Sequence, residues 1–251
     1  MASHQNPNSE SQIPAELLTA RIMQIHASIS KLESLKPSKQ VNSLFTQLVK
    51  LCTVNSSIDV KALSPEVQKM VQSLILLCGR AEGLLELEFA SFIIKLPQPL
   101  NNLNVFPYHG NYAKLANLEY TILSQNGVVK PKKAANHVAR KIVSSDAEFE
   151  KRMKLHTCDI MEVKEKLGEY DCIFLAADVR MSKEEKVKIL GHIRKYMKDG
   201  GVLLVRSANG ARAFLHPVVE ENELMEFEVL SVFHPTNDVI NSVVLVRKPI
   251  F

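Results

Sequence analysis

The fold is decided by residues 171–206, which read DCIFLAADVRMSKEEKVKILGHIRKYMKDGGVLLVR. Two short apolar runs, at 171–176 and 202–206, each have the length of a buried strand. Residues 182–197 between them have a strongly helical pattern. Because a strand, a helix and a second strand in succession are typical of a parallel βαβ unit, we expect an α/β fold with a mostly parallel sheet.

The same alternation continues on both sides of this stretch. The other expected elements are helices at about 134–144 and 147–151, a strand at 153–157, short helices near 161–167 and 210–215, and strands at 227–233 and 240–247. The short connection between the last two strands allows them to pair antiparallel.

The first half of the chain has the period of helices instead. Apolar residues step by four and three from Ala15 to Lys36, where Pro37 ends the first predicted helix. Ser38 can cap a second helix. The three residues that begin with Ser64 supply a cap, a first-position proline and an acid for a third helix.

This third helix is predicted to run to Leu96, buried on more than one side, and a fourth follows from about Asn111 to Ser124. We therefore predict a disordered tail at 1–13, a helical domain at 14–126 and an α/β domain at 127–251.

Composition excludes several classes of function. The 31 basic and 27 acidic residues leave a net charge of +4 and are spread along the chain, so we expect neither a nucleic-acid partner nor a membrane surface. No run approaches the ~18 apolar residues of a membrane span. The polar start has no apolar signal region, and the 4 cysteines form no C-x-x-C pair. We expect a cytoplasmic protein without a structural metal or disulfides.

Glycine is scarce, with 9 residues where an average usage of roughly 7% would give about 18. No two glycines are spaced G-x-G, so the chain has neither a dinucleotide fingerprint nor a phosphate-binding loop of the P-loop kind.

Polar residues at the carboxyl ends of the predicted strands are candidates for ligand binding. Asp159 follows the strand at 153–157, and its carboxylate is suited to accept a hydrogen bond from an adenine amino group. An acidic cap of the next helix is an equally good interpretation. Arg206 ends the strand at 202–206 and could hold a carboxylate through its planar guanidinium group, or form a surface ion pair.

Two glutamates and several aromatic residues form a second group of candidates. Glu82 and Glu86 stand four apart on the third predicted helix, on one face beside apolar neighbours. If partly buried there, a carboxylate would have a raised pKa and could act as a general base or anchor an amine; the alternative is a solvated face. Tyr108 and Tyr112, near Phe106, could orient a substrate or be core aromatics with bonded hydroxyls.

Six sequence segments resemble one known family in the same order along the chain. They are KLESLKPS (31–38), LCGRAE (77–82), FPYHGNY (106–112), HTCDI (156–160), RSA (206–208) and HPTNDVINSVV (234–244). On these segments the chain resembles plant nicotianamine synthases over nearly its whole length.

The resemblance implies a helical N-terminal domain on a class I methyltransferase-like, Rossmann-type sheet. Family members transfer the aminocarboxypropyl group of S-adenosylmethionine and convert three such molecules into nicotianamine, a transition-metal chelator, and three methylthioadenosines. It implies Glu82 as the acid/base carboxylate and Tyr112 as its partner hydroxyl. With this substrate in mind, we predict that Asp159 and Arg206, at the ends of their strands, bind S-adenosylmethionine. It also implies S-adenosylmethionine as substrate and no metal in the enzyme.

One departure from the family stands out. After a motif like Pro131-Lys132-Lys133, family members carry a strand, a glycine-rich turn, a helix and a second strand, whereas here Lys133 runs directly into a predicted helix. We therefore expect an incomplete sheet. The alternative to an active nicotianamine synthase is an inactive, shortened family member that associates at most with intact members through its helical domain.

Overall fold

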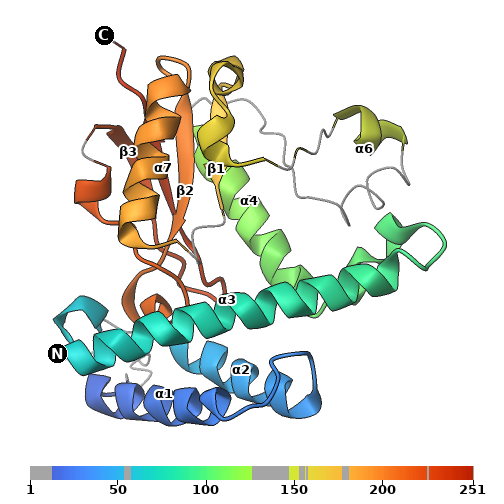
Figure 1. Cartoon of the computed structure of the whole chain (residues 1–251), viewed down its shortest axis with the longest axis vertical. Helices are drawn as coiled ribbons and strands as arrows, with labels where there is room; N and C mark the ends of the chain where they lie inside the picture. Colours follow the sequence, from blue (N-terminus) through green and yellow to red (C-terminus); the bar gives the residue numbers. More distant parts are fainter. Residues whose placement is uncertain are drawn as a thin grey trace, which may run out of the picture.

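The computed structural model describes residues 13–53, 58–125, 147–152, 156, 158–176, 181–224 and 226–250. Figure 1 shows a helical layer crossed by one long helix, and beside it a small sheet with a helix in front and another behind. The helical elements of the first half are α1 (Ala15–Ser30), α2 (Lys39–Cys52), η1 (Val60–Ala62), α3 (Pro65–Ile93), η2 (Pro99–Val105) and α4 (His109–Gln125).

The predicted helix starts are confirmed. Ser38 accepts a hydrogen bond from the Val41 backbone N–H at 3.2 Å, and Ser64 accepts one from Val67 at 3.4 Å. These caps satisfy N–H groups that have no partner within the helix.

The first helix is shorter than predicted. α1 ends at Ser30, because the next N–H groups, of Lys31 and Leu32, bond back only three residues, to Ser28 and Ile29. This tighter turn brings Leu35, predicted to lie on the helix, into the core of the helical layer.

The expectation that α3 is buried on more than one side is wrong for its second half. Leu74 is fully buried, but the side chains of Leu87 and Phe92 are 55% and 50% exposed. The reason is visible in Figure 1: α1 and α2 lie under one part of α3, and the rest of the helix projects beyond them. Glu82 and Glu86 lie in this second half of α3.

The sheet has the order β1-β2-β4-β3 among the described strands, which are β1 (Cys172–Leu175), β2 (Val202–Ser207), β3 (Glu228–Phe233) and β4 (Ser242–Arg247). β1 and β2 are parallel, as the βαβ pattern predicts. β4 pairs antiparallel with both β2 and β3, so the expected mostly parallel sheet is wrong for the described strands. The final hairpin places two antiparallel pairs beside a single parallel one.

Both faces of β2 are covered. Leu203 and Val205 point to α7 (Lys183–Tyr196) and pack with its Leu190 and Ile193. The alternate residues Val202 and Leu204 pack with Leu115, Ile122 and Leu123 of α4 on the other face. This two-sided burial explains why β2 is a continuous apolar run.

Several shorter elements agree with the predictions in place, though not always in type. α6 (Ala147–Arg152) is the helix expected at 147–151. Two 3-10 helices, η3 (Ile160–Glu162) and η4 (Glu165–Glu169), replace the helix expected near 161–167. η5 (Gly210–Phe214) stands for the helix at 210–215, and η6 (Glu221–Glu223) is additional. The helix predicted at 134–144 and most of the strand at 153–157 lie outside the described residues.

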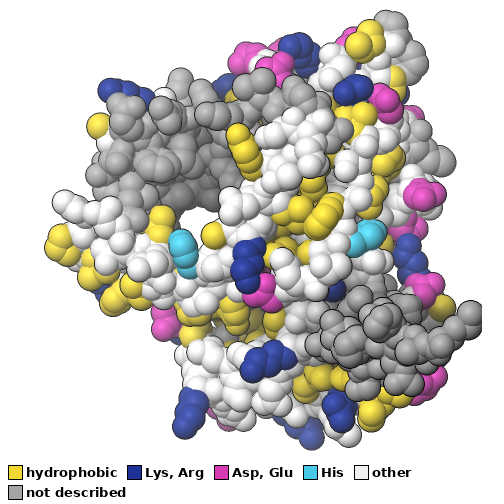
Figure 2. All heavy atoms as spheres, turned by 180° about the vertical axis from the view of Figure 1, so that it is seen from behind, with side chains coloured by type: hydrophobic (Ala, Val, Ile, Leu, Met, Phe, Trp, Pro, Cys, Tyr) yellow, Lys and Arg dark blue, Asp and Glu magenta, His cyan; other side chains and the backbone are white. Residues whose placement is uncertain are grey.

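The two layers share a core through η5. Phe214 is fully buried and belongs to the same apolar cluster as Leu18, Ile22 and Leu74 of the helical layer. Within the described ranges, no helix is both long and apolar enough to cross a membrane. Figure 2 shows the molecule from behind, where the described Lys and Arg side chains are scattered over the surface.

We expect Phe214→Ala to reduce the free energy of unfolding by about 3–5 kcal/mol, because it removes a fully buried phenyl group and leaves a cavity between the layers. Phe92→Ala, which removes a half-exposed phenyl group from α3, is the matched control and should cost less than about 1 kcal/mol. Urea unfolding monitored by circular dichroism measures both. Equal losses in the two variants would show that η5 does not join the layers.

Candidate active site

Two helices bring three polar side chains together. α3 supplies Glu82 and Glu86, one helical turn apart, and α4 supplies Tyr112. The Tyr112 hydroxyl lies 2.6 Å from Glu82 Oε1 and 3.1 Å from Glu86 Oε1. A hydroxyl has one proton to donate, so it bonds one carboxylate at a time and leaves the other for a different donor. The predicted pairing of Glu82 with Tyr112 is thus present in the structure.

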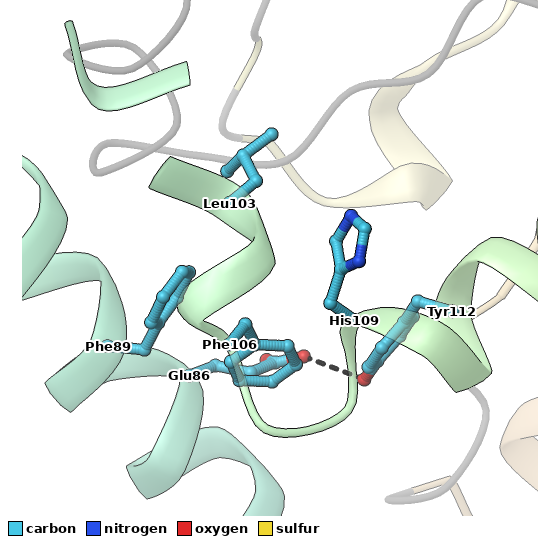
Figure 3. Close-up of a pocket in the computed structure, with 6 residues that line it drawn as sticks. All are labelled: Glu86, Phe89, Leu103, Phe106, His109 and Tyr112. Carbon is cyan, nitrogen blue, oxygen red and sulfur yellow. Dashed lines mark hydrogen bonds between the residues drawn. The ribbon is translucent and has the colours of Figure 1, made fainter. Parts of the chain in front are cut away.

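A pocket of about 280 Å³ opens beside this group and is mostly apolar. Figure 3 shows its six lining residues, with the hydrogen bond from Tyr112 to Glu86 at its base and Phe106 next to it. The Phe106 ring centroid is 4.8 Å from that of Phe89 and 5.7 Å from that of Tyr112. The lining residues are Glu86, Phe89, Leu103, Phe106, His109 and Tyr112.

The negative charge of the site resides in its carboxylates. Burial first, and then the charges of Glu82 and Glu86, raise the pKa of the Tyr112 phenol well above its ordinary value. Burial also raises the pKa of Tyr108, and it raises that of the Cys78 thiol to about 12. At neutral pH the phenols and the thiol are therefore uncharged. A neutral hydroxyl between carboxylates, with aromatic rings alongside, is a suitable environment for a cation.

Of the two interpretations of the glutamates, the solvated face is the one that the structure contains. Glu82 and Glu86 are both exposed. Apolar residues still lie close to them, because Phe89 lines the pocket with Glu86 and the charge of Glu82 helps to raise the pKa of Cys78.

Asp159 takes the capping role that was one of its two interpretations. Its Oδ1 accepts a hydrogen bond from the Met161 backbone N–H at 2.9 Å, at the start of η3. The side chain is exposed and is not one of the six that line the pocket. Whether it also meets an adenine group stays a prediction.

Arg206 binds a carboxylate, and that carboxylate belongs to the protein. Its Nε donates to Glu119 Oε1 of α4 at 2.8 Å, and the two side chains are only 11% and 4% exposed. This is a buried ion pair between β2 and α4, and the pairing partner could not be foreseen because it lies 87 positions away in the sequence.

Sequence reasoning missed three lining residues as site residues: Phe89, Leu103 and His109. His109 lies within the FPYHGNY segment, which marked the neighbourhood, and Phe89 was assigned only to the apolar face of its helix. Leu103 lies in η2, whose sequence has no helical period to indicate where its side chains point. In the part of the chain that the structure describes, no cluster of three or more His, Cys, Asp or Glu side chains could hold a metal.

Comparison with known proteins assigns the chain to a family. A family model described as "Nicotianamine synthase protein" matches residues 9–135 and 131–251. The chain belongs to the nicotianamine synthase family. It is 43% identical over 261 residues to nicotianamine synthase of Solanum lycopersicum, covering 91% of this chain and 82% of the relative. It is 45% identical over 269 residues to nicotianamine synthase 3 of Arabidopsis thaliana, covering 93% and 84%.

Solved structures share the fold. A structure of MtNAS in complex with MTA and tNA superposes with a TM-score of 0.74 at 17% identity, covering 91% of this chain and 97% of that one. A glutamate-to-glutamine mutant of MtNAS in complex with S-adenosylmethionine gives a TM-score of 0.70 at 18% identity, covering 92% and 98%. The predicted combination of a helical bundle with a methyltransferase-like α/β sheet is confirmed.

The comparisons also show a difference in length between this chain and a relative. The two matches to the family model meet at residues 131–135. The alignment with the Arabidopsis thaliana relative runs over 269 positions, although the whole chain has 251 residues, so the relative carries residues that this chain lacks. The junction itself lies outside the described residues.

The raised pKa of Tyr112 leads to a pH prediction. Below pH ~10, the ordinary pKa of tyrosine, the phenol is protonated in both folded and unfolded chains. Above it the unfolded chain loses this proton first, so the stability that Tyr112 contributes is lost as the pH rises towards its higher folded pKa. Urea unfolding between pH 9 and 11 should show a steeper fall for the wild type than for Tyr112→Phe. Parallel curves would contradict the shift.

The Arg206–Glu119 ion pair can be tested as a structural element. Glu119→Ala leaves the buried guanidinium without this carboxylate and should lower the free energy of unfolding by about 3 kcal/mol. Asp171→Ala, which breaks an exposed pair with Lys198, is the control and should cost less than about 1 kcal/mol. If Glu119→Ala is no more costly than the control in chemical denaturation, Arg206 is available for a ligand.

Proposed function

We propose that the chain is an active nicotianamine synthase that condenses three molecules of S-adenosylmethionine into nicotianamine and releases three methylthioadenosines. The observation that carries the proposal is the Tyr112 hydroxyl within hydrogen-bond distance of both Glu82 and Glu86, at the base of an aromatic pocket. The family membership and the structures of MtNAS with S-adenosylmethionine and with MTA support the same substrate.

The chemical step needs a base near an amine. The nitrogen attacks the carbon next to the sulfonium sulfur of a second molecule, so an N–C bond forms and a C–S bond breaks. The electron pair of the C–S bond goes to sulfur, which leaves as the neutral thioether of methylthioadenosine. The proton lost by the nitrogen has to be taken up, and we assign this role to the Glu82 carboxylate.

Tyr112 and Glu86 divide the remaining work. The short bond from the Tyr112 hydroxyl to Glu82 fixes the orientation of the base before the reaction. Glu86 lines the pocket, where its charge attracts the ammonium or sulfonium of the substrate. The faces of Phe106 and Phe89 add cation–π attraction for the same groups. This division of roles agrees with a site whose net charge is negative and whose substrate is a cation.

Asp159 and Arg206 are proposed to bind the nucleoside and carboxylate parts of S-adenosylmethionine. Asp159 is exposed and uses Oδ1 for its cap, so we assign Oδ2 to the adenine amino group. For Arg206 the competing role is the pair with Glu119. The cytoplasmic location, the lack of a resident metal and the lack of a nucleic-acid partner stay predictions from the sequence.

The inactive alternative is less well supported. An inactive family member would need only its helical surface for association with intact members, whereas here residues from α3, η2 and α4 meet around one pocket. The segment lacking near Lys133 is the observation in favour of inactivity, and measurement decides between the two.

Incubation of the purified chain with S-adenosylmethionine, followed by mass spectrometry, should show methylthioadenosine and nicotianamine. Glu82→Gln removes the base and should slow product formation by about 10²-fold or more. Tyr112→Phe keeps the ring but loses the hydroxyl, and we expect a fall of about tenfold or more. Glu88→Gln, on the exposed surface of the same helix, is the matched control and should retain wild-type activity.

The opposite outcome is equally clear. A folded wild type that forms neither product, and that binds no S-adenosylmethionine in calorimetric titration, would establish the inactive alternative.

A further inference from the structure

The loop between β3 and β4 makes hydrogen bonds and apolar contacts with several other parts of the molecule. Asn237 Oδ1 accepts a hydrogen bond from the Val239 N–H at 3.0 Å, which closes the loop on itself. Val239 is almost fully buried and packs in one apolar cluster with Leu115 and Ile122 of α4. The residue between them, Asp238, is thereby fixed beside the first turns of that helix.

α4 holds Asp238 with two side chains. Lys114 Nζ lies 2.7 Å from both carboxylate oxygens of Asp238, and Asn111 Nδ2 donates to the Asp238 backbone carbonyl at 3.1 Å. Asn111 and Lys114 are three residues apart, so they lie on one face of the helix. Lys114 also lowers the pKa of the Asp238 carboxyl group, as expected for a close ion pair.

The helical layer holds the same loop from another side. Arg212 of η5 is 5% exposed, and its guanidinium donates to the carbonyl oxygens of Asn237 and Val239. A further bond runs from Arg212 to the carbonyl of Thr53, at the end of α2. The loop between β3 and β4 is therefore bonded to α4 and to the helical layer as well as to its own strands.

Tyr112 lies in sequence between Asn111 and Lys114, the two residues that bind Asp238. It is the fourth residue of α4, in a first turn whose His109 and Tyr112 N–H groups bond to the carbonyls of Phe106 and Tyr108 before the helix. About 100° round the helix from Asn111, its side chain turns to α3, where its hydroxyl meets Glu82 and Glu86. Any shift of the first turn against the sheet would move this hydroxyl relative to the carboxylates.

We propose that Asp238 is a positioning residue: by binding Lys114 and Asn111 it fixes the first turn of α4, and so holds the Tyr112 hydroxyl between Glu82 and Glu86. The inference rests on the proposed function. We expect the Asp238 contacts to affect the reaction rate more than the free energy of unfolding. An exposed ion pair contributes little to folding, whereas a displacement of about 1 Å in a reacting site can lower the rate 10²-fold.

The test compares Asp238→Asn with a matched control. The substitution removes the charge that Lys114 binds and leaves the backbone carbonyl that Asn111 binds. The control, Asp171→Asn, breaks a similar exposed pair in which Asp171, just before β1, lies 2.6 Å from Lys198 Nζ. We expect Asp238→Asn to lower kcat about tenfold, with KM for S-adenosylmethionine within about twofold of wild type. The control should keep both constants, and the two variants should have similar melting temperatures.

A charge exchange tests the mechanism of the effect. The double variant Lys114→Asp/Asp238→Lys rebuilds the pair with its charges reversed, so it should recover most of the kcat that either single change loses. A KM increase at unchanged kcat would instead place Asp238 in substrate binding and overturn the proposal. An equal loss of kcat in the Asp171→Asn control would also overturn it.

A second measurement does not depend on activity. With 3-fluorotyrosine incorporated at position 112, the ¹⁹F resonance reports the surroundings of this ring. It should shift or broaden in Asp238→Asn and remain unchanged in Asp171→Asn. If the wild type makes no product, the proposed function fails, yet the resonance still decides the positioning role. An unchanged resonance in Asp238→Asn contradicts the inference whether or not the enzyme is active.

Discussion

The burial of β2 on both faces is the constraint on which the rest of the structure depends. A strand that alternates Val202 and Leu204 on one side with Leu203 and Val205 on the other needs an apolar cover on each. α7 supplies one cover and belongs to the same βαβ unit. The other cover is α4, which comes from the first half of the chain. Because α4 lies on the sheet, its first turn is delivered to α3, and the meeting of these two helices creates the candidate site. Packing of the sheet and assembly of the site are thus parts of one arrangement.

The electrostatics of the site depend on the exposure of the glutamates of α3. Glu82 and Glu86 are exposed to solvent, so two carboxylates can lie one helical turn apart without the desolvation cost of buried charges. Tyr112, whose phenol keeps its proton, lies between them and can orient only one at a time. Charge repulsion, hydrogen bonding and the aromatic wall all favour a bound cation. An ammonium or sulfonium group would supply the positive charge that this arrangement lacks.

Periodicity predicted what depends on near neighbours. The caps of α2 and α3, the limits of α7 and the strand β2 follow from local patterns of about four to fifteen residues. The insertion of β4 between β2 and β3 could not be predicted, because strand order depends on contacts across long stretches of sequence. The predicted burial of the second half of α3 was wrong for a related reason. Many apolar residues on a helix do not show how far the neighbouring helices extend along it. Spacing placed Glu82 and Glu86 on one face, but only the family resemblance paired Glu82 with Tyr112, 30 residues away. For Asp159 the local capping preference was the interaction that the structure contains.

The contacts that hold α4 in the described part of the chain come from the sheet and the loop before β4. The two family matches meet at residues 131–135, and a relative carries residues that this chain lacks. α4 is anchored by β2 through the buried Arg206–Glu119 pair, by the loop before β4 through Asp238, and by the apolar cluster around Val239. These partners all lie beyond residue 200. The described contacts that place Tyr112 beside the two glutamates therefore involve no residue next to Lys133.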